Sequence, residues 1–214
     1  MKKLTPKTRW TLAVLAVVVA LVAAFGAQLR DNSTTVAAPR PSPDRAHRDA
    51  DTPAALAGPR ERANLLPCPP PGSSPGPAAL RGVLLECAGD GSTVDVARAL
   101  AGRRVVLNLW AYWCAPCAAE LPAMAEYQRR VGADVMVVTV HQDENETAGL
   151  LRLAELGVRL PTVQDGQRLI AAALKVANVM PATVVLRPDG SVAQTLLRDF
   201  ASADEIAAVV GNDA

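Results

Sequence analysis

The chain has 214 residues, a formal net charge of +1 at neutral pH and 20% charged residues. A charge so close to zero argues against nucleic acid as the main partner, because phosphate backbones are bound by strongly basic surfaces. Half of the residues are apolar but only 3% are aromatic, and much of the apolar fraction is alanine, so composition overstates the core.

The first element is an uncharged segment, residues 10–29, preceded by basic residues and no acid in residues 1–9. As a helix it would be about 30 Å long, which matches the hydrocarbon thickness of a membrane. The basic flank predicts a cytoplasmic N-terminus, with everything after residue 29 exported. We therefore predict a transmembrane signal-anchor at residues 10–29. A cleaved signal peptide stays open as the alternative, although its apolar region is usually only about 7–15 residues long.

The next segment, residues 30–66, is polar and rich in proline from Pro39 onward. Such a composition buries too little apolar surface to fold by itself, which predicts a flexible, extended linker. Residues 67–214 then form the predicted folded domain.

Four cysteines, Cys68, Cys87, Cys114 and Cys117, allow three disulfide pairings. A Cys114–Cys117 ring leaves Cys68–Cys87, and an oxidising exported location lets such a bond persist. Closing a loop of that length stabilises a domain by about 3 kcal/mol. We expect a structural disulfide that pins the N-terminal extension to the domain. A second redox pair and a zinc site are the alternatives, but structural zinc sites usually have two close-spaced ligand pairs, and this chain has one.

The folded domain is predicted to mix short strands with helices. The predicted strands are 83–86, 92–94, 105–109, 135–140, 161–164, 182–187 and 191–197. The predicted helices are 95–100, 114–130, 145–156, 170–177 and one opened by the capping box 202–205. The apolar run 105–109 is typical of a central strand covered on both faces, and 161–164 is expected at a sheet edge. The order predicts an α/β fold whose central mixed sheet has helices on both faces.

The chemical motif is Trp113-Cys114-Ala115-Pro116-Cys117, which follows the strand 105–109 and opens a helix. Free N–H groups and a partial positive charge at a helix N-terminus favour thiolate over thiol. The nearer sulfur, Cys114, is therefore the predicted nucleophile, and Cys117 is placed to resolve the mixed disulfide. The motif predicts a redox site.

These residues together resemble the thioredoxin superfamily, because the motif follows a buried strand and Met180-Pro181-Ala182-Thr183 precedes a later one. The lead-in Asn108-Leu109-Trp110-Ala111, the run Glu120-Leu121-Pro122 and the helix-strand insert at 145–164 are similar to the TlpA-like branch. That branch consists of membrane-anchored, extracytoplasmic thiol-disulfide oxidoreductases, several of which serve cytochrome c maturation. The resemblance implies a thioredoxin-like fold with an N-terminal β extension.

The resemblance also implies substrate-binding residues around the thiols. Pro181 is expected to be a cis proline opposite the cysteines, where its neighbouring backbone pairs with an extended substrate. Met180 departs from the Thr or Val that often precedes this proline. Trp113 is expected as a partly exposed wall beside the thiols, whereas Trp110 is expected in the core.

For proton transfer, the resemblance implies that Glu120 exchanges a proton with Cys117, three residues before it. A surface glutamate in the first turns of a helix is an equally weighted alternative. Asn108 stands where cytoplasmic thioredoxins carry a buried aspartate, which raises the interest of Glu120. His141, after the strand 135–140, is expected to be a solvated loop residue.

The predicted function is extracytoplasmic thiol-disulfide exchange, in the reducing direction, on a protein disulfide or dithiol substrate. A membrane electron donor is the expected partner, and no metal or cofactor is expected. A thiol oxidase or isomerase of the same fold is the main alternative. A copper-binding carrier would need more ligands than His141 adds to the Cys pair. A peroxide-reducing relative is less favoured because residues 107–114 do not match its reactive-cysteine motif.

Overall fold

The computed structural model describes residue 20 and residues 51–211. The chain divides into two units, 1–42 and 43–214, and all elements below belong to the second. The strands are β1 (Leu84–Cys87), β2 (Thr93–Asp95), β3 (Arg104–Trp110), β4 (Val135–His141), β5 (Thr162–Gln164), β6 (Ala182–Leu186) and β7 (Val192–Leu196). The helices are α3 (Pro53–Ala63), the short 3-10 helix η1 (Ala78–Leu80), α4 (Val96–Ala99), α5 (Ala115–Val131), α6 (Glu146–Leu156), α7 (Leu169–Ala173) and α8 (Ala203–Gly211).

Within the described residues, the strands form one sheet in the order β2-β1-β5-β4-β3-β6-β7. The central strands β3, β4 and β5 run parallel, whereas β6 and β7 on one side and β1 and β2 on the other pair antiparallel. From Val105 to Trp110 every residue of β3 is buried, as expected for a central strand covered on both faces. The predicted mixed sheet is confirmed.

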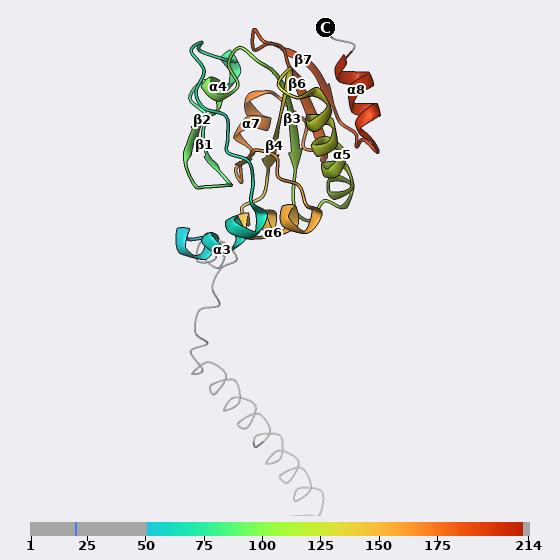
Figure 1. Ribbon diagram of the computed structural model, residues 1–214. Helices are drawn as coiled ribbons and strands as arrows, with labels where there is room; N and C mark the ends of the chain where they lie inside the picture. Colours follow the sequence, from blue (N-terminus) through green and yellow to red (C-terminus); the bar gives the residue numbers. More distant parts are fainter. Residues whose placement is uncertain (1–19, 21–50, 212–214) are drawn as a thin grey trace, which may run out of the picture. The chain divides into compact units, whose positions relative to one another are not determined.

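The two faces of the sheet carry separate cores, and helices cover both (Figure 1). Alternate residues of β3 supply them: Val106 and Trp110 face α5 and α8, whereas Leu107 and Leu109 face α4 and α7. The first core also contains both Cys114 and Cys117. The redox motif therefore follows the end of a buried central strand, on the α5 face of the sheet.

The prediction that 161–164 is an edge strand was wrong. Strand β5 lies inside the sheet, because the β1–β2 hairpin pairs with its outer side, with Glu86 opposite Gln164 and Cys87 opposite Val163. Thr162 is buried and its hydroxyl lies 2.7 Å from that of Thr139 on β4. A short run with Thr and Gln looks like an edge in isolation. Its true position follows from a long-range pairing that local sequence does not encode.

Helix α7 is shorter than the predicted 170–177. It ends at Ala173, and Lys175 then adopts a left-handed backbone conformation with φ of 56°. That conformation cannot continue a right-handed helix, although the apolar spacing continues to Ala177. By contrast, α6 ends at Gly157 in the left-handed conformation, as the sequence predicted.

The prediction of a flexible linker over residues 30–66 does not hold at its end, where α3 forms. Thr52 caps this helix by accepting a hydrogen bond from the Ala55 N–H at 3.3 Å, and Pro53 stands where a missing N–H has no cost. Leu56 and Ala63 pack with Leu150 of α6 in a small third core. Docking on α6 stabilises a helix whose composition by itself does not predict one. Residues 30–50 lie outside the described residues.

The disulfide between Cys68 and Cys87 joins the segment after α3 to strand β1, with 5.9 Å between the Cα atoms. Cys87 is fully buried and Cys68 packs against the second core. This is the pairing that the sequence analysis expects, and it fixes the chain between α3 and the sheet.

No helix among the described residues combines the length and apolar character needed to cross a membrane. The predicted anchor at 10–29 lies outside those residues apart from residue 20. The anchor therefore stays a prediction.

Candidate active site

The two motif cysteines form a disulfide across the N-terminus of α5. Cys114 is the N-cap residue, and its Sγ accepts a hydrogen bond from the Cys117 N–H at 3.3 Å. Pro116 lies in the first turn, where its missing N–H would have no partner in the helix. The helix thus begins one residue later than predicted. It presents its positive end to the sulfur of Cys114, which stabilises that atom as a thiolate once the bond is reduced.

The two cysteines differ in exposure. Both are buried, but Cys114 is 5% exposed whereas Cys117 is fully buried. Cys114 is therefore the residue of the pair with surface open to an incoming group. This asymmetry agrees with the order of events that the sequence analysis assigns to the pair.

Pro181 follows a cis peptide bond from Met180, as the resemblance implies. Strand β6 begins at Ala182, which pairs with Leu109 near the end of β3. This register brings Pro181 to the same end of the sheet as the loop that leads to the cysteines. Met180 is partly buried and packs against the core that contains Cys114. Met180 and Pro181, two of the three residues predicted to bind substrate, thus lie at the end of the sheet from which the chain leads to the disulfide.

Trp113 is exposed over 57% of its surface, in agreement with the expected wall beside the thiols. Its indole N–H donates a hydrogen bond to a carboxylate oxygen of Asp143 at 2.8 Å. Asp143 lies in the loop after β4, and the sequence analysis noted no role for it. The sequence signal was only an acidic loop after a buried strand. Trp110, in contrast, is fully buried.

Glu120 is fully buried on α5, so the alternative of a surface glutamate is wrong. Burial, with a smaller contribution from nearby Asp199, raises the pKa of its carboxyl to about 8 against the opposing effects of Asn108, Thr183 and Arg198. A carboxyl with such a pKa is mostly protonated at pH 7 and ionises just above it.

Asn108 and Thr183 line the buried space around Glu120. They are direct cross-strand partners on β3 and β6, and both are fully buried. Their side-chain polar atoms, like both carboxyl oxygens of Glu120, have no oriented hydrogen bond within the described residues. Buried polar groups of this kind usually mark a site where protons or substrate groups are handled. The sequence alone pointed to Asn108 as a residue of this site but not to Thr183. The position of Thr183 beside Asn108 follows only from the pairing of β3 with β6.

The expectation that His141 is a solvated loop residue was wrong. It is the last residue of β4 and is 1% exposed. Its ring packs against Trp110 at a tilt of 50° with 4.8 Å between centroids, and its Nδ1 lies 2.8 Å from the side-chain oxygen of Gln164. Burial lowers its pKa, which favours the neutral ring. The strand continues one residue beyond the predicted boundary and takes the histidine into the core.

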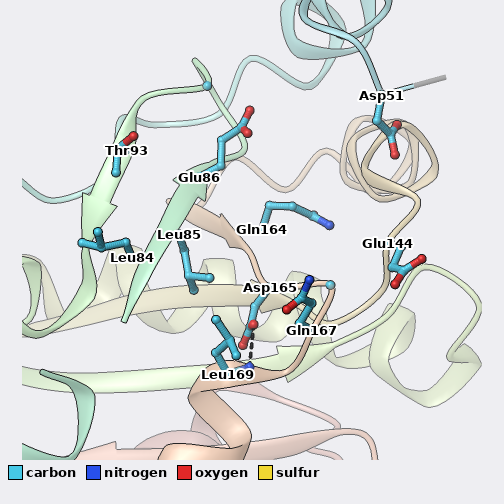
Figure 2. Close-up of a pocket in the computed structure, with 12 residues that line it drawn as sticks. Asp51, Leu84, Leu85, Glu86, Thr93, Glu144, Gln164, Asp165, Gln167 and Leu169 are labelled. Carbon is cyan, nitrogen blue, oxygen red and sulfur yellow. Dashed lines mark hydrogen bonds between the residues drawn. The ribbon is translucent and has the colours of Figure 1, made fainter. Parts of the chain in front are cut away.

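A separate pocket of about 840 Å³ lies between the β1–β2 hairpin and the loop before α7 (Figure 2). Leu84 and Leu169 give it an apolar side, and Glu86, Glu144 and Gln164 a polar one. Neither cysteine of the redox pair lines it. The redox pair is therefore not part of this pocket.

The model of the family described as Redoxin matches residues 71–209, which is well over half of the chain. The chain belongs to the redoxin family. This redoxin is 34% identical over 98 residues to the thiol-disulfide oxidoreductase ResA of Bacillus subtilis, an alignment that covers 45% of this chain and 54% of ResA. The chain spans about half the length of the curated relatives it matches.

Solved structures show the same fold. The structure of DsbF of Mycobacterium tuberculosis, in mixed oxidised and reduced forms, is 24% identical, covers 65% of this redoxin and 99% of DsbF, and has a TM-score of 0.57. The bacterioferritin comigratory protein of Xanthomonas campestris, studied for alkyl peroxide reduction, is 21% identical with a TM-score of 0.54, covering 66% and 98%. The predicted thioredoxin-like fold is confirmed. Because a protein studied for alkyl peroxide reduction shares this fold, the fold does not by itself assign the function.

Proposed function

We propose that this redoxin is an extracytoplasmic thiol-disulfide oxidoreductase that reduces disulfides in a protein substrate. The observation that carries the proposal is the Cys114–Cys117 disulfide across the N-terminus of α5, in which Cys114 keeps some exposed surface and Cys117 is fully buried. The names of the curated relatives support the same chemistry.

The reaction begins with the reduced pair. The thiolate of Cys114 attacks one sulfur of the substrate disulfide, a mixed disulfide forms, and the other substrate sulfur leaves and takes up a proton. Cys117 loses its proton and attacks the Sγ of Cys114, which releases the second substrate thiol. Two electrons pass to the substrate, and Cys114–Cys117 is left oxidised. An external dithiol donor must then reduce this ring.

Glu120 is the proposed proton acceptor for Cys117 in the second step. A buried thiol cannot give its proton to bulk water directly, and Glu120 lies one helical turn further along α5 in the same buried region. Its pKa of about 8 is close to the ordinary thiol value of about 8.5, so transfer between the two groups is nearly balanced. In the reverse step, the protonated carboxyl would return a proton to the Cys117 thiolate.

Trp113, Met180 and Pro181 are the proposed substrate-binding residues. Trp113 offers an exposed apolar face, and Pro181 directly precedes β6 at the cysteines' end of the sheet. A disulfide-bearing segment of the substrate would lie between them.

The proposed location is the outer side of the cytoplasmic membrane. The uncharged segment 10–29 with its basic flank supports a signal-anchor, and the Cys68–Cys87 disulfide is of a kind that persists in oxidising compartments. A membrane electron donor would recharge Cys114–Cys117. The resemblance to the TlpA-like branch supports the narrower proposal of a role in cytochrome c maturation, and the similarity to ResA supports thiol-disulfide exchange.

Insulin reduction and partner trapping test the proposal. The full chain should reduce insulin, Cys114→Ala should abolish the reaction, and Cys117→Ala should accumulate mixed disulfides with its substrates in the native membrane. The identity of the trapped proteins, and whether they are released as dithiols or disulfides, separates a reductase from an oxidase or isomerase. Insulin reduction by Cys114→Ala at the wild-type rate would overturn the assignment.

A further inference from the structure

Hydrogen bonds at the first turn of α6 connect the segment 51–66, here called the arm, to Trp113 beside Cys114. We propose that Asp143 is a positioning residue that holds Trp113 for substrate binding, and that the arm supports it through the first turn of α6. This inference rests on the proposed function, because it concerns how that same site binds its protein substrate.

The first link is Asp143 itself, which uses both carboxylate oxygens. One accepts the indole N–H of Trp113 at 2.8 Å, and the other accepts the backbone N–H of Asn145 at 2.9 Å. The side chain therefore connects the exposed tryptophan to the residue that caps α6. An indole that is 57% exposed has few packing contacts to fix its orientation, so one oriented hydrogen bond to a charged acceptor has a large influence on it.

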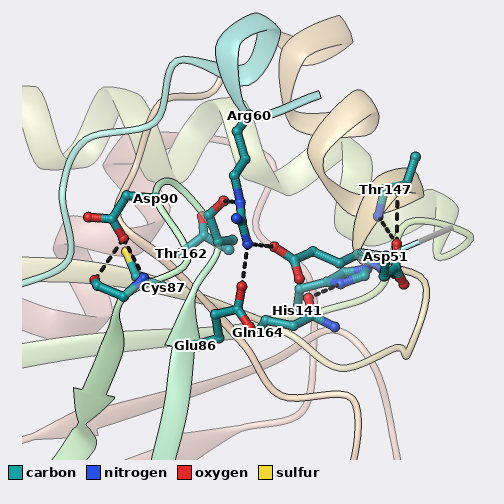
Figure 3. A network of polar contacts seen from close by, with 12 residues as sticks. Asp51, Arg60, Glu86, Cys87, Asp90, His141, Thr147, Thr162 and Gln164 are labelled. Atoms are coloured by element: carbon teal, nitrogen blue, oxygen red, sulfur yellow. Dashed lines mark hydrogen bonds and ion pairs between the residues drawn. The ribbon is translucent and has the colours of Figure 1, made fainter. Parts of the chain in front are cut away.

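The second link is the N-terminus of α6. Asn145 caps the helix by accepting the Ala148 N–H at 3.0 Å. Asp51 of the arm accepts the backbone N–H groups of Glu146 and Thr147 at 3.2 and 3.1 Å, and the Thr147 hydroxyl at 2.9 Å (Figure 3). The Asp51 carboxylate, in addition to the Asn145 amide oxygen, thus satisfies N–H groups at this helix start that an ordinary N-cap leaves open.

The third link is Arg60 of α3, which fixes the arm against two other elements. Its guanidinium donates to Glu146 at 3.0 Å, to the backbone oxygen of Ala88 at 3.2 Å, and also to Glu86 on β1 (Figure 3). Gly91 gives room for this side chain, since a Cβ there would come within 2.6 Å of it. Asp51, just before α3, and Arg60, near the end of α3, thus both hold the arm against α6.

The consequence is that the indole of Trp113 has its substrate-binding orientation before the substrate arrives. When Trp113 already faces its binding position, the substrate does not have to order it, and its affinity rises accordingly. The chemistry at Cys114 and Cys117 does not depend on the indole. Loss of the Asp143 bond should therefore raise KM and leave the exchange step itself unchanged.

The test uses the full chain in detergent micelles, with insulin as the substrate. We expect Asp143→Ala to raise KM for insulin roughly three- to tenfold, the effect of one lost hydrogen bond, with kcat and the rate of Cys114 alkylation within about twofold of wild type. The indole ¹⁵N–¹H resonance of Trp113 should move. Asp51→Ala should also raise KM and move the resonance in the same direction, but by smaller amounts than Asp143→Ala. Glu155→Gln, which removes a charge from an exposed side chain of the same helix, should change neither.

A second variant guards against a fold defect in Asp143→Ala. Trp113→Phe keeps an aromatic face, removes the N–H and leaves α6 untouched, so it should reproduce the rise in KM. Wild-type KM in both Asp143→Ala and Trp113→Phe, or an indole resonance that stays in place in Asp143→Ala, would overturn the inference. Failure of the proposed function is a different result, because the wild-type chain would then reduce no insulin although the resonance still responded to Asp143.

Discussion

The two disulfides of this redoxin have similar Cα separations, 5.3 Å for Cys114–Cys117 and 5.9 Å for Cys68–Cys87, but their surroundings are opposite. The first closes a ring at the N-terminus of α5 and contains one cysteine that is 5% exposed. The same helix carries the buried Glu120. The second joins the segment after α3 to strand β1 and packs into the second core.

The comparison shows that the surroundings of a disulfide decide its role. A helix N-terminus stabilises a thiolate, and a buried carboxyl with a raised pKa supplies a place for the proton. Around Cys68–Cys87, β-strand pairing and apolar packing surround the bond, and these features stabilise a fold. We therefore expect exchange at one pair and structural support from the other.

The largest expected effect is on stability, from Cys68→Ser together with Cys87→Ser. Loss of this cross-link should lower the free energy of unfolding by about 3 kcal/mol, because the unfolded chain gains the freedom of the opened loop. Denaturant unfolding measures the loss, and insulin reduction below the new unfolding transition should stay within about twofold of wild type. If the double variant kept its stability but lost exchange, the two pairs would have the opposite roles.

An intermediate effect is expected from Glu120→Gln, which keeps the shape but removes the ionisable group. Release of the mixed disulfide by Cys117 should slow about 100-fold, which is the lower end of the usual contribution of a positioned proton acceptor. Rapid-mixing kinetics should show a wild-type rate that rises with pH through about 8, as the carboxyl ionises, and a variant without this rise. A variant with the same inflection would assign the proton to another group.

The smallest effect is a pH dependence of folding stability from the same residue. The folded pKa of Glu120 is raised to about 8, so folding favours the protonated carboxyl, and its contribution is lost as pH rises through that value. Between pH 7 and pH 9 the loss amounts to about 1 kcal/mol. Thermal unfolding of Glu120→Gln should lack this part of the slope and should show greater stability than wild type at pH 9. Parallel curves for the two proteins would contradict the buried position of the carboxyl.

Local sequence predicted the elements whose signals are contained in one segment. The apolar run of β3, the glycine at the end of α6 and the Cys-x-x-Cys pair at the start of α5 all appear in the structure within one or two residues of their expected positions. The resemblance to the thioredoxin superfamily added the cis bond before Pro181, which no local pattern would indicate.

Predictions went wrong where a contact between distant segments decides the outcome. Strand β5 became internal because the N-terminal hairpin pairs with it, and α3 formed in a proline-rich segment because α6 offers a docking face. His141 is buried because β4 runs one residue further than its apolar pattern and packs the ring against Trp110. In each case the stabilising partner is far away in the chain.

The amino-acid sequence by itself determined the chemistry at Cys114 and Cys117, because two thiols at a helix start carry their reactivity in their spacing and local backbone. Only the tertiary structure decided the environment of that chemistry. It buried Glu120 of α5 beside Asn108 of β3 and Thr183 of β6, where desolvation shifts its pKa, and it brought Asp143 from the loop after β4 to the indole of Trp113. Desolvation and hydrogen-bond geometry depend on the packing of elements far apart in sequence, so they exist only once the chain has folded.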